Sequence, residues 1–440
     1  MSGVPRVKVG IMNEPVVDFV LLGEYQLADG TKVTGVQHAE ATADGRVAWN
    51  GRVADSVAFE PTTEDCSIEL KGVTIGVNFH WERKEDQRFS GALHLIVEHG
   101  RLTAVNVLPV EDYLLSVISS EMSATASLEL LKAHAVISRS WLLAQIDKNK
   151  RITEAHEVYK AVEDGADDEM IKWYDREDHV NFDVCADDHC QRYQGITRQS
   201  TERVRDAIKA TWGEVLTYGG ELCDARFSKC CGGVYEEFEN CWEPKHYDYL
   251  EARRDGDNEM DFPDLTKEAA AEEWILSSPK AHCNTTDVKI LSQVLNNYDQ
   301  ETTDFYRWTV EYSQEELSAL ILSRSGIDYG QILDLQPVAR GTSGRLYKLK
   351  IVGTKKSLTI GKELEIRRTL SPSHLYSSAF IVERHDVKNG VPGKFVLRGA
   401  GWGHGVGLCQ IGAAVMGENG HNYKEILLHY FINANITTLY

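Results

Sequence analysis

Two histidines and two cysteines lie close together in the sequence. His179, Cys185, His189 and Cys190 follow the pattern H-x5-C-x3-H-C. Two imidazoles and two thiolates make a complete tetrahedral ligand set for Zn²⁺. Because four protein ligands would leave no position open for a substrate, such a site is expected to be structural. The spacing is not that of a zinc finger or zinc ribbon. A Cys185–Cys190 disulfide and a solvated acidic loop are the alternative interpretations.

Three charged residues could form a second site. Lys132 and Arg139 lie seven residues apart, about two helical turns, on one stripe of an otherwise apolar segment. Buried cations need an anion nearby, and Glu121, shortly before this segment, is the candidate. A carboxyl group beside apolar residues can have a raised pKa and act as a general acid. The alternatives are that both cations reach solvent and that Glu121 is an ordinary surface residue.

Glycines at alternating positions mark a third segment, with residues 399, 401, 403, 405 and 407 all glycine. The segment lacks the dinucleotide-binding fingerprint. Glycine at this density lets the backbone approach a ligand closely, with His404 and Gln410 as polar contacts. A glycine-rich turn without a ligand is an equal alternative. A His404–Cys409 thiol dyad is conceivable, but no third group that would orient it is visible.

The elements that must hold these residues alternate between strand and helix. Short apolar runs separated by turn residues predict strands over the first hundred residues. Helical spacing predicts helices over 110–122 and 128–146, and the second is apolar nearly all round, so it should be buried. A capping box from Ser313 to Glu316 and a stop at Gly326 mark a further helix. We also expect helices over 201–211 and 423–431, largely helical structure over 264–325 and strands over 332–397. The predicted fold class is mixed α+β.

Composition excludes several classes of protein. The chain has 440 residues, 42% of them hydrophobic, which suits two or three globular domains rather than a disordered chain. With 47 Lys and Arg against 67 Asp and Glu, its net charge is −20, so nucleic acid and anionic membranes are not expected partners. No apolar run of about 18 residues predicts a transmembrane segment, and no signal peptide is visible. Nine cysteines, an odd number, exclude a small disulfide scaffold.

Several of these segments together resemble one family. VLPVEDYL (107–114), SEM (120–122) and LKAHAVISR (131–139) are similar to the signature of the stage II sporulation protein D (SpoIID/LytB) family of bacteria. GWGHGVGLCQIGA (401–413) and EILLHY (425–430) resemble its carboxy-terminal signature. The pieces GTSGR (341–345) and CGG (231–233) are also similar. The resemblance covers roughly residues 95–440.

The resemblance implies a function. Members of this family are lytic transglycosylases, that is, lyases that cleave peptidoglycan strands stripped of stem peptides in the cell wall. Glu121 then matches the catalytic acid/base, and Lys132 and Arg139 match basic residues of the same motif. Substrate would contact Ser228, Gly403, His404 and Gln410. The His179, Cys185, His189 and Cys190 cluster resembles a structural zinc site, and no organic cofactor is expected.

The resemblance also implies an architecture and a location. We expect a β-rich unit over 1–95, a catalytic core over 96–245 that carries the zinc-type cluster, an inserted helical and β unit over 246–390, and the carboxy-terminal part of the core over 391–440. The family acts in the cell envelope. The sequence departs from the family pattern at His134, where glutamine is usual, at Cys409, where serine is usual, and at FSKCC (227–231), where a His-Ser pair is usual.

Three other functions compete with this one. Some family members are named as enhancers of cell-wall amidases, so the chain could bind glycan and activate an amidase without catalysis. It could be a hydrolase, with Glu111 or Asp112 as a second carboxylate. It could also be a cysteine hydrolase that uses Cys409 or Cys231.

Overall fold

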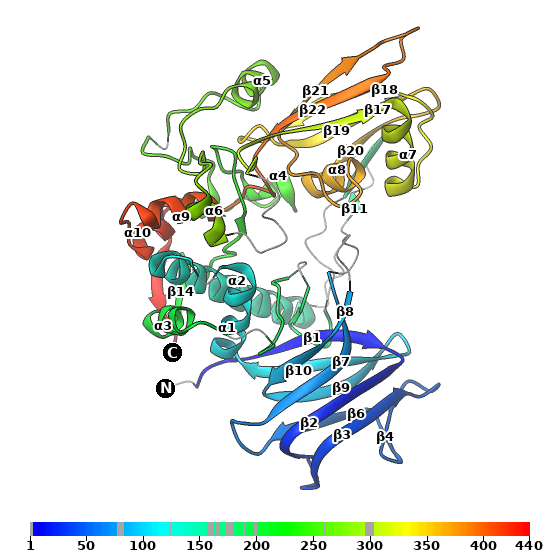
Figure 1. The fold of residues 1–440 in the computed structure, drawn as a ribbon, viewed down its shortest axis with the longest axis vertical. Coiled ribbons are helices and arrows are strands. Elements are labelled where there is room, and N and C mark those ends of the chain that lie inside the picture. The colour runs from blue at the N-terminus through cyan, green and yellow to red at the C-terminus, as the bar shows by residue number, and fades with distance from the viewer. Residues whose placement is uncertain are drawn as a thin grey trace.

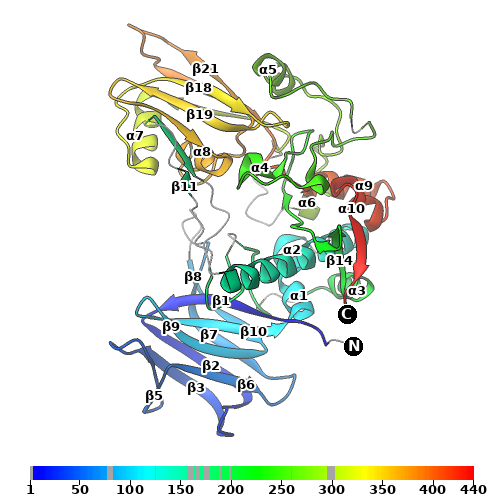
Figure 2. The ribbon, with the colours of Figure 1, turned by 180° about the vertical axis from the view of Figure 1, so that it is seen from behind.

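The structure is a computed structural model. It describes residues 3–440 except 77–82, 124, 156–161, 164–167, 173–178, 188–189, 198–199, 259 and 295–302. The chain contains both helices and strands, and the strands form several sheets, which confirms the predicted α+β class. Figures 1 and 2 show a β-rich part at one end of the molecule, a second group of sheets at the other, and helices between them.

The β-rich part is built from the first hundred residues, as the sequence predicts. Its strands follow the order β13-β1-β10-β9-β6-β2-β3-β4-β5, and β7 pairs with β2 and β8. Buried residues such as Val7, Val9, Val17 and Phe19 alternate with outward-facing ones, so each strand turns one face to the core. The strands are β1 (Arg6–Glu14), β2 (Val16–Gln26), β3 (Lys32–Ala41), β4 (Val47–Trp49), β5 (Arg52–Ala54), β6 (Ser56–Pro61), β7 (Ser67–Ile75), β8 (Arg83–Ser90), β9 (Ala92–Glu98), β10 (Arg101–Pro109) and β13 (Val184–Cys185).

A long helix lies at the centre of the molecule. Helix α1 (Val110–Glu121) begins where β10 ends, and α2 (Leu128–Ala155) follows it, so both predicted helices are confirmed and the second is longer than expected. Residues 133–143 in the middle of α2 are all buried, as predicted. It contacts α1, α3 (Glu202–Ala210), α9 (Gln410–Glu418), α10 (Tyr423–Tyr430) and β14 (Glu214–Tyr218). Strand β14 pairs with β15 (Glu221–Leu222) and β24 (Asn435–Thr438).

The far end of the molecule has a second hydrophobic core. One sheet has the order β11-β12-β20-β19-β18 and another β17-β22-β21. The prediction of helix over 264–325 is partly wrong, because RWTVEYS forms β17, which pairs with β22 along its whole length. The capping box and the stop at Gly326 are confirmed. The elements are β11 (Val162–Glu163), β12 (Glu169–Lys172), α5 (Glu268–Leu276), β17 (Arg307–Ser313), α7 (Gln314–Ser325), β18 (Ile332–Arg340), β19 (Leu346–Gly353), β20 (Ser357–Gly361), α8 (Glu363–Thr369), β21 (Phe380–His385) and β22 (Lys394–Ala400). Helix α6 (Val288–Val294) lies nearer the centre, where it contacts α9.

The glycine-rich segment carries the chain from this far end back to the centre. It follows β22 and leads through β23 (Leu408–Cys409) into α9, and β23 pairs in parallel with β16 (Phe227–Ser228). Gly401, Gly403, Gly405 and Gly407 all have positive φ, between 71° and 93°. The segment wraps around the guanidinium of Arg345, which is buried and donates to the carbonyl of Gly403 at 3.1 Å. The alternating glycines are therefore required by the backbone, whether or not a ligand binds there.

Replacing Gly405 with alanine should destabilise the fold by crowding as well as strain. A Cβ atom on Gly405 would lie 2.5 Å from Cζ of Arg345, whereas one on Gly420 would meet no atom within 4 Å, although both residues have positive φ. We expect Gly420→Ala to lower the free energy of unfolding by about 1–2 kcal/mol through strain alone, and Gly405→Ala by at least about 1 kcal/mol more. Urea denaturation of both variants measures the difference; equal losses would contradict this packing.

Candidate functional site

Glu121 is the last residue of α1, and its side chain is half-buried. The backbone leaves the helix at Met122, which is extended and buried. Gln293 of α6 holds the turn that follows, because its carbonyl accepts from the amide of Ser123 at 3.0 Å and its side-chain oxygen accepts from the amide of Ser127 at 2.9 Å. The position of Glu121 is thus fixed by contacts on both sides of it.

Lys132 lies one turn into α2 and pairs with a carboxylate of its own helix. Its Nζ donates to Glu129 at 2.6 Å and lies 5.6 Å from the ring centre of Tyr423. The other oxygen of Glu129 accepts from the amide of Tyr423 at 2.8 Å. Lys132 therefore belongs to a contact that joins α2 to the start of α10. The expectation that Glu121 is its anion is wrong, because the nearer carboxylate is on the same helix.

Arg139 is fully buried, and its partner is Glu111. The guanidinium donates to both carboxylate oxygens at 2.8 and 2.7 Å, and to the carbonyl of Glu214 at 2.9 Å. Glu111 also accepts from the hydroxyl of Tyr440 at 2.6 Å. The expectation that Arg139 faces Glu121 is therefore wrong. Spacing alone could not tell which of two carboxylates in one helix lies opposite it.

His134 and Gln410 connect the two halves of the family signature. The amide of Gln410 donates to Nε2 of His134 at 3.2 Å, and Nδ1 of His134 lies 3.2 Å from the hydroxyl of Ser138. All three side chains are buried, and the His134 ring packs edge-on against Phe227. Burial and the nearby Lys229 lower the pKa of His134 to about 3, so this histidine is neutral. The structure thus gives Gln410 a partner within the protein.

Ser228 and the glycine-rich segment lie side by side. Ser228 is buried, and in the described part of the structure its hydroxyl has no hydrogen-bond partner. A Cβ atom on Gly403 would lie 3.0 Å from that of Ser228. Nδ1 of His404 accepts from the amide of Val406 at 3.0 Å, and burial together with nearby arginines, Arg226 first among them, holds the pKa of His404 well below its usual value. Among the described contacts His404 does not meet Cys409, which leaves the thiol dyad without support.

The predicted zinc ligands are close together where the structure describes them. Potential ligand atoms of His179, Cys185 and Cys190 lie within 4.8 Å of one another, and His189 falls outside the described residues. Sγ of Cys190 is 3.5 Å from Nε2 of His179 and accepts from the amide of Cys185 at 3.4 Å. Strand β13 carries Cys185 and pairs in parallel with β1, so the ligands are attached to the edge of the β-rich part. This donor set suits a structural Zn²⁺.

A second set of potential ligands was not predicted from the sequence. Cys231, Asp255, Cys283 and Cys409 are all buried, and their ligand atoms also lie within 4.8 Å of one another. Local spacing could not reveal this group, because its members come from three separate parts of the chain. The sequence marked Cys409 and Cys231 one by one, as departures from the family pattern, but not as members of one group.

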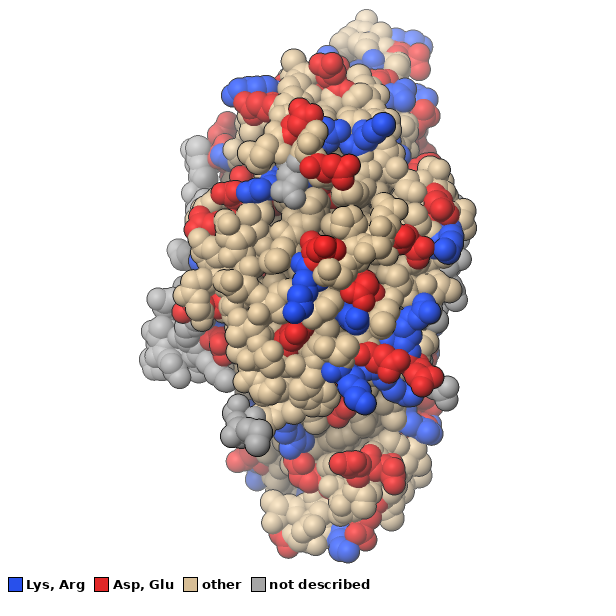
Figure 3. Space-filling model, turned by 90° about the vertical axis from the view of Figure 1, so that its left-hand side faces the viewer, with Lys and Arg blue, Asp and Glu red and all other residues tan. Residues whose placement is uncertain are grey.

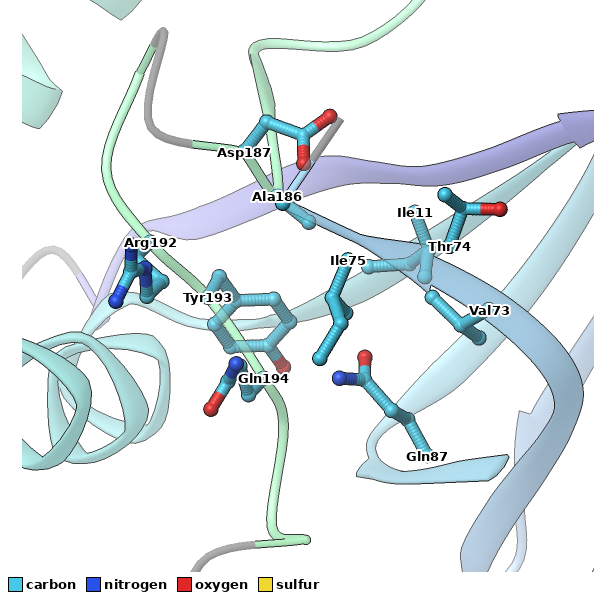
Figure 4. A pocket seen from close by; sticks show the side chains of 11 residues that line it. Ile11, Val73, Thr74, Ile75, Gln87, Ala186, Asp187, Arg192, Tyr193 and Gln194 are labelled. Carbon is cyan, nitrogen blue, oxygen red and sulfur yellow. The ribbon is translucent and has the colours of Figure 1, made fainter. Parts of the chain in front are cut away.

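Two cavities lie beside the β-rich part and away from Glu121. A groove of about 920 Å³ runs between β strands and α1, with Asp112, Glu64, Arg6 and Arg205 at its edges. Burial and the nearby Glu111 and Glu64 raise the pKa of Asp112. The other cavity holds about 20 Å³, room for a single water molecule, next to the ring of Tyr193 and the side-chain oxygen of Gln87, which has no hydrogen-bond partner within the described part of the chain (Figure 4). Glu121 lines neither of them.

Charge is mixed on the surface. On the face shown in Figure 3, Lys and Arg side chains lie beside Asp and Glu side chains rather than in a separate basic patch. Among the described residues no helix is long and apolar enough to cross a membrane.

Comparison with known proteins identifies the central part of the chain. Residues 98–218 match the family model described as Stage II sporulation protein. This range contains α1, α2, the candidate acid Glu121 and the predicted zinc ligands. The chain carries a SpoIID domain. A second model, described only as a domain of unknown function, matches residues 236–407.

Similar proteins extend beyond the SpoIID domain. The Stage II sporulation protein D of Bacillus amyloliquefaciens is 24% identical over 336 residues, which cover 76% of each chain. The protein named Amidase enhancer of Bacillus subtilis is 23% identical over 338 residues, which cover 73% of this chain and 40% of that one. An uncharacterized protein of Brachyspira hyodysenteriae is 25% identical over 348 residues, 79% of this chain and 72% of the relative. These matches support a role connected with the cell wall.

Removing Arg139 should unfold or strongly destabilise the SpoIID domain. Arg139→Gln leaves the carboxylate of Glu111 buried without its charge partner, which typically costs about 3–5 kcal/mol. The double variant Arg139→Met/Glu111→Leu removes both charges and should recover most of that loss. Urea denaturation of the three proteins measures the free energies of unfolding. A single variant as stable as the wild type would show that the pair is not needed.

His134 should make the SpoIID domain lose stability in acid. The unfolded chain takes up a proton on this histidine below about pH 6.5, whereas the folded protein does so only near pH 3. Between those values the free energy of unfolding should fall by about 1.4 kcal/mol per pH unit through this one group. His134→Gln, which restores the residue usual in the family, should remove that slope. Urea denaturation at about pH 6.5 and about pH 4.5 compares the two proteins; parallel losses would contradict the assignment.

Proposed function

We propose that the protein is a lytic transglycosylase that cleaves the bond between N-acetylmuramic acid and N-acetylglucosamine in peptidoglycan strands without stem peptides. The SpoIID domain and its relatives support a cell-wall role. The observation that carries the choice of reaction is the position of Glu121 at the end of α1, a full helix length away from Glu111 and Asp112 in the first turn. The site of action that follows is the bacterial cell envelope.

The reaction needs one acid that later acts as a base. Glu121 in its protonated form donates to the glycosidic oxygen as the bond to C1 of the muramic acid breaks. The resulting carboxylate then takes the proton of the C6 hydroxyl while that oxygen bonds to C1 and closes a 1,6-anhydro ring. Glu121 ends the cycle protonated, and no water is consumed. The carbonyl end of α1 is the negative end of the helix, so it disfavours a charged carboxylate there and favours the acid form that begins the cycle.

The two alternative carboxylates on α1 do not suit hydrolysis. An inverting glycosidase holds its carboxyl groups about 6.5–9.5 Å apart, and a retaining enzyme about 5–5.5 Å. Asp112 precedes Glu121 by nine residues, a rise of about 13.5 Å along the helix. Glu111 is further away and buried, and both of its oxygens are bonded to Arg139. Neither can therefore activate a water molecule for the same bond as Glu121.

Other residues would hold the substrate and the fold. The hydroxyl of Ser228, which has no hydrogen-bond partner among the described residues, is the group we propose for substrate binding. Gly403 lies against it, with its amide bonded to Tyr376 and its carbonyl to Arg345. His404 and Gln410 are bonded within the protein and support that segment. Arg139 acts as a positioning residue that fixes α1, and Lys132 joins α2 to α10. A Zn²⁺ bound by His179, Cys185, His189 and Cys190 would attach the segment after α2 to the β-rich part.

A second function is favoured by one relative. The protein named Amidase enhancer matches 73% of this chain, so the chain could bind glycan and increase the activity of a cell-wall amidase without cleaving the strand. Such a function needs glycan binding but no proton transfer by Glu121. The two functions therefore differ in how they respond to the loss of this carboxyl group.

Glu121→Gln should abolish strand cleavage and leave binding intact. The amide keeps the shape of the side chain but cannot donate or accept the proton, so the rate on denuded glycan should fall by a factor of about 100 or more. Asp112→Asn, the matched control on the same helix, should remain active. Mass spectrometry of the products should find 1,6-anhydro ends, one water lighter than reducing ends. Near-normal cleavage by Glu121→Gln would contradict the assignment.

The enhancer function has its own test. Two results together would favour the enhancer function over our proposal. The wild type would bind denuded glycan without yielding anhydro products, and both the wild type and Glu121→Gln would increase the turnover of an added amidase. Anhydro products from the wild type and none from Glu121→Gln would exclude it as the sole function.

A further inference from the structure

Three thiols and one carboxyl group meet in the main hydrophobic core, beside a further buried thiol, Cys230. Cys231 follows β16, Asp255 and Cys283 lie on either side of α5, and Cys409 directly precedes α9. All four are buried, with exposed fractions of 2% or less. None of them belongs to the candidate substrate site or to the His179 cluster.

The distances within this group match the edges of a tetrahedral metal site. With zinc–sulfur bonds of about 2.3 Å, sulfur ligands lie about 3.8 Å apart, and a sulfur and a carboxylate oxygen slightly less. Sγ of Cys231 is 3.5 Å from Sγ of Cys283 and 3.6 Å from Oδ2 of Asp255. All ligand atoms, including Sγ of Cys409, lie within 4.8 Å of one another. Every edge is therefore short enough for one ion to bridge.

Backbone amides and one hydroxyl donate hydrogen bonds to the sulfur and carboxylate atoms of this group. The amide of Cys231 donates to Sγ of Cys409 at 3.2 Å, and the amide of Gly233 donates to Sγ of Cys231 at 3.4 Å. Asp255 accepts from the amide of Cys283 at 3.0 Å and from the hydroxyl of Tyr430 at 2.8 Å. Such donors orient metal ligands and stabilise their negative charge.

Positive charge compensates the site from one side. Three thiolates and a carboxylate around a dication leave two negative charges, which are costly in a buried place. Two arginines donate to the backbone next to the ligands, Arg345 to the carbonyl of Cys231 at 3.0 Å and Arg307 to that of Gly232 at 3.0 Å. Arg345 is itself buried.

We propose that Cys231, Cys283, Cys409 and Asp255 bind a Zn²⁺ ion that joins three parts of the chain, separately from the His179 cluster. Thiolate-rich tetrahedral sets select zinc over hard cations such as Mg²⁺ and Ca²⁺. Four protein ligands leave no open position, so the ion is structural. It attaches the start of α9, and with it the glycine-rich segment, to the loop after β16. The proposal does not depend on the function proposed above.

Metal analysis of the full chain tests the ligand set. We expect Cys283→Ser to lose one zinc ion per chain relative to the wild type, by mass spectrometry of the metal content. Cys66→Ser is the matched control, because Cys66 is an equally buried thiol in the β-rich part, and it should lose none. An unchanged zinc content in folded Cys283→Ser would overturn the proposal, as would a disulfide between Cys231 and Cys283 in the wild type.

A second measurement uses a variant in which all four ligands of the proposed site are present. Cys185→Ser removes a ligand of the His179 cluster but none of these four. X-ray absorption at the zinc edge of this variant should find about three sulfur ligands near 2.3 Å and one oxygen near 2.0 Å. A variant without zinc, or zinc bound mainly by nitrogen, would contradict the assignment even if Cys283→Ser fails to fold.

Discussion

The buried pair of Arg139 and Glu111 is the contact on which the centre of the molecule depends. It fixes α1 against α2, and through the carbonyl of Glu214 and the hydroxyl of Tyr440 it also holds the β14 region and the last residue of the chain. A buried charge pair tolerates little movement, since each charge needs the other. The end of α1, where Glu121 lies, is therefore held in place from the opposite end of the same helix.

The sequence was sufficient for much of the fold. Helical spacing located α1 and α2, and the apolar surface of α2 predicted its burial, because periodicity reports how a helix packs. The capping box at Ser313 and the stop at Gly326 were correct because they depend on local backbone chemistry alone. The region before Ser313 was read as helix and forms β17, since its pairing with β22 comes from residues about ninety positions away. Such pairing has no local signal.

The candidate site was only partly predictable for the same reason. The sequence placed Glu121, Lys132 and Arg139 in one motif but did not identify the partners of the two cations. Glu129 lies nearer to Lys132 in sequence than Glu121 does, whereas Glu111 lies farther from Arg139, so sequence separation does not decide between these carboxylates. The ligands of the His179 cluster lie close together in the sequence, so the cluster could be predicted. Cys231, Asp255, Cys283 and Cys409 lie far apart in the sequence, so this group could not. The alternating glycines suggested a ligand, and the structure shows in addition that the guanidinium of Arg345 lies against Gly401 and Gly405.

The choice between a transglycosylase and a hydrolase is the central claim, and the fate of water tests it most directly. Digestion of denuded glycan in ¹⁸O-labelled water separates the two reactions, because hydrolysis transfers a water oxygen to C1, whereas closure of the anhydro ring uses the C6 oxygen of the sugar. The account predicts that the wild-type protein yields anhydro products that carry no label. Label at a new reducing end, dependent on Glu121, would contradict it.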